Sequence, residues 1–194
     1  MKNLKNYLSE NSKIIFKIII NHFGAAVFGF ILSIVTLRAS SFVFYIAGAF
    51  SIIFYWFLLY VSLWEKGAED KTRIDGGRLE RNNLSGLFYS LIAYIPIFVF
   101  IIILFIASPF VTPDEVTAGG NFYGIIKIIL NYMNAMYLSI YTAFNGVFTN
   151  PILYPICYVI TTLASCLVCT LSYISGVSGQ RCLIPERTSK NTKQ

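Results

Sequence analysis

Long apolar runs dominate the chain, and short segments between them carry most of the charge. A membrane-spanning helix needs about 20 apolar residues to cross a hydrocarbon core of about 30 Å. Residues 18–37, 42–64 and 87–110 meet that length, and so do residues 151–177, whose prolines fall in or near a first helical turn. The pattern predicts an all-α integral membrane bundle with four spanning helices.

A fifth apolar segment, residues 123–148, has polar residues along one side. They recur at steps close to the helical period, at Lys127, Asn131, Asn134, Thr142 and Asn145. In a lipid-facing span, such a lysine and three asparagines would cost several kcal/mol. We therefore expect an amphipathic helix on the outer face of the bundle. The alternative is a fifth spanning helix whose polar side faces the bundle interior.

Lysine and arginine set the expected orientation, because cytoplasmic segments of membrane proteins are enriched in them. The segment 1–17 carries four basic residues, the loop 65–86 carries five, and the tail 178–194 carries Arg181, Arg187, Lys190 and Lys193. Residues 111–150 instead begin with acidic side chains. We expect one membrane domain with both termini in the cytoplasm and residues 111–150 outside.

Composition agrees with this picture and narrows the class of protein. Of the 194 residues, 56% are apolar and 12% are charged, whereas soluble domains carry roughly 25% charged residues. This excludes a soluble enzyme, a secreted disulfide scaffold and a disordered regulator. The net charge of +6 lies in tails and loops beside apolar runs, so its natural partner is an anionic lipid leaflet and not nucleic acid.

The loop 65–86 is unusual because its five acids balance its five bases. A loop that only fixes topology would be basic. Glu65, Glu69 and Arg73 are one helical turn apart, so we expect the second span to continue as a helix and to break at Gly76 and Gly77. Its proposed partner-binding residues are Lys71, Arg73 and Arg78. The alternative is a solvated connector whose ion pairs contribute little.

Two further groups of residues have competing interpretations. Ala25, Gly29 and Ser33 continue a small-residue strip from Asn21, which predicts close helix packing within the chain or against a partner. If the protein binds a small neutral solute, uncharged groups on the 123–148 segment would line the pocket; these are Asn131, Asn134, Tyr137, Tyr141 and Asn145.

Candidate chemistry elsewhere is weak. His22 is the only histidine and lies near the start of the first span, where we interpret it as an interfacial residue bonded to backbone or a lipid headgroup. Cys166 and Cys169 form a CxxC that resembles quinone-coupled thiol oxidoreductases. Both lie mid-span, where small packing residues are the better interpretation. We expect no catalytic residues, no cofactor and no metal site.

The sequence WEKGAED at residues 64–70, followed by glycines and a span interrupted by Pro96, resembles a pattern in small membrane proteins of low-GC Gram-positive bacteria. The resemblance implies a multi-pass protein of a bacterial plasma membrane and brings no activity with it. We expect a non-enzymatic accessory or interaction subunit of a membrane complex. The alternative is a substrate-binding or permease subunit for a small neutral solute.

Overall fold

The computed structural model describes residues 4–38, 40–111, 118–145 and 150–179, with side chains within 11–38, 40–111, 120–144 and 150–179. Three long helices dominate: α1 (Leu4–Thr36), α2 (Ser41–Asp75) and α7 (Leu153–Ser178). The shorter elements are α3 (Ser85–Ala93), α4 (Ile95–Ala107), η1 (Ser108–Phe110), α5 (Ala118–Met133), η2 (Ala135–Tyr137) and α6 (Leu138–Asn145).

The all-α membrane bundle is confirmed. Three described helices are long and apolar enough to cross a membrane, and they belong to α1, α2 and α7. A fourth span is present if α3 and the helix that follows it are counted together. Long apolar helices satisfy their backbone groups internally, which is the condition for crossing lipid.

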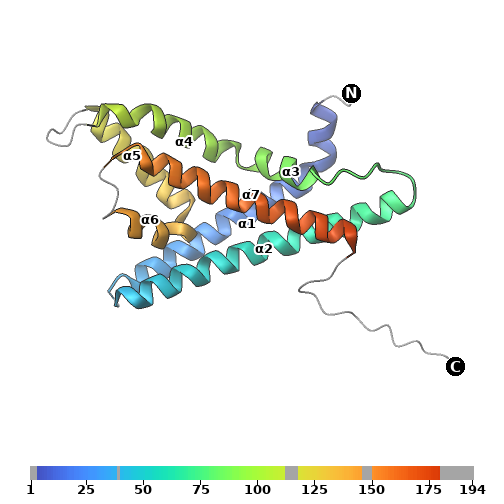
Figure 1. Cartoon of the computed structure of the whole chain (residues 1–194), viewed down its shortest axis with the longest axis horizontal. Coiled ribbons are helices and arrows are strands. Elements are labelled where there is room, and N and C mark those ends of the chain that lie inside the picture. The colour runs from blue at the N-terminus through green and yellow to red at the C-terminus, as the bar shows by residue number, and fades with distance from the viewer. Residues whose placement is uncertain (1–3, 39, 112–117, 146–149, 180–194) are drawn as a thin grey trace.

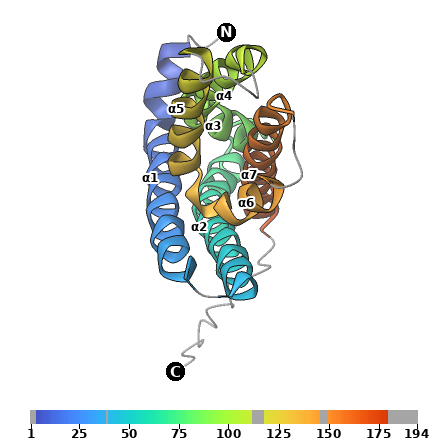
Figure 2. The same ribbon diagram turned by 90° about the vertical axis from the view of Figure 1, so that its left-hand side faces the viewer.

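The long helices form the frame of the bundle (Figure 1). Helix α2 runs back along α1 after the turn that joins them, and α7 then runs parallel to α2. Their shared interior contains Tyr55, Leu59 and Leu63 of α2, all fully buried. Figure 2 shows α5 and α6 lying between α1 on one side and α7 on the other.

The predicted span at residues 87–110 is bent by 60° where α3 meets α4. Helix α3 ends at Ala93, and Tyr94 caps it through its N–H bond to Ser90. Pro96, two residues later, has no N–H, so the carbonyl of Ile92 loses its usual donor. The bend is therefore a consequence of a single proline.

The predicted amphipathic segment 123–148 differs from a single helix on the outer face. Helix α5 ends at Met133, η2 follows, and α6 leads away again. At the break, the side-chain amide of the buried Asn134 donates to the Leu130 carbonyl, and the φ of Asn134, −114°, lies outside the helical range. The turn is inserted in the bundle, with Met136 fully buried.

The described beginning of α1, the connection from α2 to α3 and the end of α7 lie together at one end of the bundle (Figure 1). We call this the charged end, since the charges of residues 11–17 and 65–81 are located there. The turn between α1 and α2 is at the opposite end. The basic tail 180–194 lies outside the described residues.

Candidate functional site

The charged end begins where α2 continues past its apolar run. After Trp64 the helix continues to Asp75, as predicted, and ion pairs join successive turns along it. Lys66 Nζ lies 2.6 Å from Asp70 Oδ1, and Arg73 pairs with Glu69. This spacing of four residues is the one at which helical side chains meet.

Helix α2 is fixed to α7 by close backbone packing and one buried acid. A Cβ atom on Gly67 would collide with the Tyr173 carbonyl, and one on Gly176 would collide with the Trp64 carbonyl. Asp70 is 1% exposed, and its second carboxylate oxygen accepts a 2.9 Å hydrogen bond from the Tyr173 hydroxyl. The two helices cannot separate here without exposing this carboxylate.

The break after α2 occurs at Gly76 and Gly77, which confirms the predicted position. Gly77 has a φ of +68°, which favours glycine, and the Arg78 N–H bonds back to the Arg73 carbonyl at 2.9 Å. The following residues are exposed but locally bonded: the Leu84 N–H donates to the Asn82 side chain at 3.0 Å. The connection from α2 to α3 is therefore an exposed surface whose backbone is held by local hydrogen bonds.

The structure places the three predicted partner-binding residues around this region. Arg73 and Arg78 are exposed, whereas Lys71 is half-buried and its ammonium lies against Gly179 at the end of α7. Arg78 can therefore face another molecule directly, and Arg73 can do so from its exposed pair with Glu69. Lys71 instead covers the last turn of α7.

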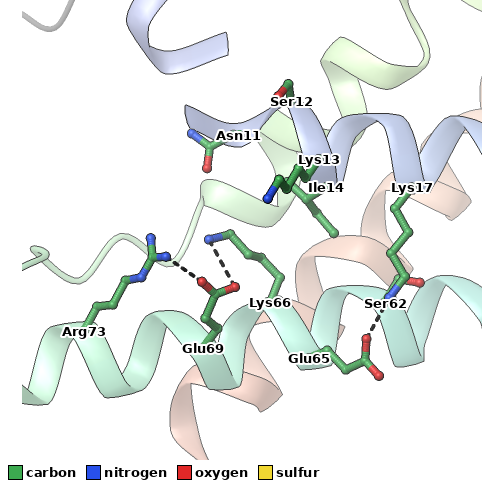
Figure 3. Close-up of a pocket in the computed structure, with 10 residues that line it drawn as sticks. All are labelled: Asn11, Ser12, Lys13, Ile14, Lys17, Ser62, Glu65, Lys66, Glu69 and Arg73. Carbon is green, nitrogen blue, oxygen red and sulfur yellow. Dashed lines mark hydrogen bonds and ion pairs between the residues drawn. The ribbon is translucent and has the colours of Figure 1, made fainter. Parts of the chain in front are cut away.

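A groove of about 360 Å³ lies between α1 and α2 at the same end (Figure 3). The sequence interpretation identified its α2 wall and missed its α1 wall, because only the tertiary fold brings the two together. Lys17 of α1 and Glu65 of α2 pair across it at 2.7 Å. Its lining residues are Asn11, Ser12, Lys13, Ile14, Lys17, Ser62, Glu65, Lys66, Glu69 and Arg73.

The groove has more positive than negative charge. Lys66 is neutralised by the buried Asp70, while Lys17 and Arg73 each face one glutamate. Lys13 is exposed, pairs with no acid among the described residues, and extends into the same space (Figure 3). The groove therefore suits an anionic ligand.

A second polar region lies inside the bundle. His22 Nδ1 is 2.7 Å from the Tyr55 hydroxyl, which is 2.6 Å from the Tyr94 hydroxyl. Farther along, Tyr137 accepts a bond from Trp56 and shares another with Ser165 at 2.8 Å. We call these six residues the inner polar cluster. The interfacial interpretation of His22 misses its partner, which comes from another helix.

The predicted solute-lining residues lie beside this cluster and bond mostly to α7. Tyr158 donates to Asn131, Tyr141 shares a 2.7 Å bond with Thr161, and Tyr137 bonds to Ser165. The side chain of Asn145 lies outside the described residues. A stripe of hydroxyl residues on α7 was the missed signal, since Thr161 and Ser165 are one helical turn apart.

Lys127, the charged member of the predicted polar stripe, lies over the aromatic ring of Tyr154 on α7. Its ammonium is 3.5 Å from the ring centroid. A cation is attracted to the negative face of an aromatic ring, and the attraction is stronger where water is scarce. This contact shows how an otherwise apolar helix accommodates a lysine.

The small-residue strip of α1 packs within the chain. Ala25 is fully buried and Ser33 nearly so. A Cβ atom on Gly29 would overlap the Met136 backbone of η2, which explains how a broken helix approaches α1 so closely. Among the described cysteines, Cys166 and Cys169 are buried and carry free thiols.

Comparisons with known proteins add no relative to this geometry. No protein family, curated protein or solved structure matches the chain. The functional proposal is therefore drawn from the arrangement of the charged end and the inner polar cluster.

Proposed function

We propose that the protein is a non-enzymatic accessory or interaction subunit of a complex in a bacterial plasma membrane. Its charged end faces the cytoplasm in this proposal, because lysine and arginine gather there and the positive-inside rule then applies. The partner-binding surface is the end of α2 together with the connection to α3, from Arg73 to Arg78.

The rigid attachment of α2 to α7 is the observation that supports this proposal. The helix is held by Gly67, Gly176 and the buried Asp70, and it then extends past the end of α7 (Figure 1). A surface that is already ordered loses less conformational entropy when it binds. Because acids and bases alternate on it, it can complement one partner and disfavour others.

Co-purification from native membranes tests the proposal. The full-length protein should retain a partner in stoichiometric amount, and Arg78→Glu should release most of it while membrane insertion stays normal. Charge reversal at Arg73 should add to the loss, whereas reversal at Lys71, which lies against Gly179, should have a smaller effect. Arg38→Glu is the matched control, since it reverses an exposed arginine in the turn between α1 and α2.

The proposal fails if the intact protein brings down no stoichiometric partner. It also fails if Arg78→Glu and Arg38→Glu reduce the partner equally, because the effect would then follow net charge and not this surface. In either case the connection from α2 to α3 is a solvated linker.

The broken helices favour a second candidate, a binding subunit for a small neutral solute. Transporters often place interrupted helices beside their binding sites at the middle of the membrane. Here the turn at Asn134 is buried, and Asn131 borders a cavity of about 210 Å³ with Phe30 and Leu138. Uncharged amides and hydroxyls of this kind suit a neutral ligand.

A ligand screen distinguishes the two candidates. A solute that raises the melting temperature of the purified protein, and loses this effect in Asn131→Leu, would favour the solute-binding role. Arg78→Glu should leave such binding unchanged. The interaction role predicts the reverse pattern, with partner loss in Arg78→Glu and none in Asn131→Leu.

A further inference from the structure

We propose that the groove between α1 and α2 at the charged end binds the headgroup of an anionic phospholipid. The acyl chain of the same lipid lies in an apolar hollow on the neighbouring face of α1. This site shares Arg73 with the proposed partner surface but is distinct from it, because its decisive cation, Lys13, is on α1 and not on the connection after α2.

The depth of the groove supports a lipid headgroup as its ligand. The apolar run of α1 begins directly after Lys17, and that of α2 ends directly before Glu65. These two residues pair with each other at 2.7 Å, so both helices change from apolar to charged at the same level. That level is where a lipid headgroup lies when the apolar runs fill the hydrocarbon core.

The groove also has positive charge that remains available to a ligand. Lys13 has no acidic partner among the described residues and extends into the groove (Figure 3). The Lys17–Glu65 pair is about half exposed on both sides, so Lys17 can exchange the glutamate for a phosphate at little cost. Basic pockets between helix ends are established binding places for anionic headgroups.

A buried hydroxyl adds a neutral donor to the groove wall. Ser62 is 3% exposed, and its oxygen accepts a 2.8 Å hydrogen bond from the Asn21 amide. Because that bond uses the oxygen as an acceptor, its proton remains available for a ligand oxygen. Lysine ammonium groups and a hydroxyl are donors that suit a phosphodiester.

The apolar surface beside the groove favours a lipid over other anions. It is a shallow, open hollow on α1 bordered by Ser12, Lys13, Ile15, Phe16 and Ile19. Ser12 and Lys13 border both spaces, so the polar and apolar sites are adjacent. Phe16 is 62% exposed. An acyl chain would cover this ring, whereas a free phosphate or an acidic peptide would leave it exposed.

The experiment measures lipid binding to the purified full-length protein in a neutral detergent. Native mass spectrometry counts bound phosphatidylglycerol and phosphatidylcholine that have identical acyl chains. We expect the protein to retain phosphatidylglycerol preferentially. Lys13→Gln should weaken its binding about fivefold, which is the effect of one lysine at an anionic membrane surface.

Three variants act as controls on that result. Lys13→Arg keeps the charge and should keep the binding, whereas Lys17→Gln tests a second cation of the same groove and should weaken binding. Arg38→Gln removes an equal charge at the opposite end of α1 and should have no effect. All variants change exposed residues, and their melting temperatures without added lipid should match the original protein.

Four results would overturn the proposal. Equal retention of phosphatidylcholine would show that the charge of the headgroup is irrelevant to binding. Equal losses of binding in Lys13→Gln and Arg38→Gln would show that the lipid does not bind in this groove. Displacement of the lipid by inorganic phosphate at a concentration equal to that of the lipid would indicate a free-phosphate site. Displacement by an acidic peptide at that concentration would identify the groove as a protein-binding surface.

Discussion

The charged end and the inner polar cluster are two polar regions of one apolar bundle, and they satisfy their polar groups differently. The charged end uses ion pairs, and several of these, such as Lys17 with Glu65, are half exposed. The inner polar cluster uses neutral hydrogen bonds, such as the one between Tyr55 and Tyr94. Most of the charges lie where water and headgroups reach them, because burying a charge is costly, and the buried Asp70 is compensated by Lys66.

The difference also separates an exposed surface from an interior whose tyrosine hydroxyls already have hydrogen-bond partners. Tyr55, Tyr94 and Tyr137 have their hydroxyls bonded within the bundle, so a ligand there must replace existing bonds. At the charged end, Lys13 and Arg78 are exposed, so a ligand can reach them without replacing bonds inside the bundle. We therefore propose that binding occurs at the charged end and that the inner polar cluster supports the structure.

The largest expected effect comes from Asp70. This residue belongs to the charged end but is buried, as Tyr55 of the inner polar cluster is. Asp70→Asn would leave Lys66, whose side chain is 12% exposed, beside a neutral amide. Removing one partner of a buried pair costs about 3–5 kcal/mol, so the free energy of unfolding should fall by that order. Denaturant unfolding in detergent micelles measures it. A loss below about 1 kcal/mol would mean that water already reaches this pair.

The next effect comes from the backbone contact that holds α2 to α7. In Gly176→Ala the new methyl group meets the Trp64 carbonyl, so the helices must move apart. Overpacking of this kind costs about 1–3 kcal/mol, and the melting temperature should drop accordingly. Gly24→Ala is the matched control, since nothing lies within 4 Å of its added Cβ. Equal effects of the two substitutions would contradict the close contact.

A similar or smaller loss is expected inside the bundle. Tyr55→Phe removes the hydroxyl that connects His22 to Tyr94 and leaves buried polar atoms without that partner. Such a loss costs about 1–3 kcal/mol, again measured by unfolding. Tyr45→Phe changes an exposed tyrosine and should have almost no effect. If the two phenylalanine variants are equally stable, the inner polar cluster contributes nothing to stability.

The smallest effect is predicted for the exposed ion pair between Glu69 and Arg73, whose side chains are each 54% exposed. Glu69→Gln should change the free energy of unfolding by less than about 1 kcal/mol. Comparison with Asp70→Asn, one residue away on the same helix, then isolates the effect of burial. A loss as large as that of Asp70→Asn would remove the distinction between exposed and buried pairs.

Much of the fold could be predicted because it depends on local sequence. The length of apolar runs gave the long helices, and Gly76 with Gly77 marked where α2 ends. The break at Asn134 could not be predicted, because a polar stripe with helical spacing fits an unbroken helix equally well. It depends on tertiary packing of the turn against Gly29, which no pattern within residues 123–148 contains.

The candidate site was predictable on one side only. The alternating charges after Trp64 identified the α2 wall of the groove. The α1 wall, with Lys13 and Lys17, depends on the register at which α1 packs along α2, and 48 residues separate Lys17 from its partner Glu65. The same reasoning explains His22, because its partner Tyr55 lies on the next helix, 33 positions along the sequence.

The most direct test of the division between the two regions compares Arg78→Glu with Tyr55→Phe in one experiment. It measures the amount of co-purified partner per molecule and the melting temperature of each variant. We predict that Arg78→Glu loses the partner at an unchanged melting temperature, whereas Tyr55→Phe keeps the partner and melts at a lower temperature. Partner loss in Tyr55→Phe together with full retention in Arg78→Glu would contradict the assignment of binding to the charged end.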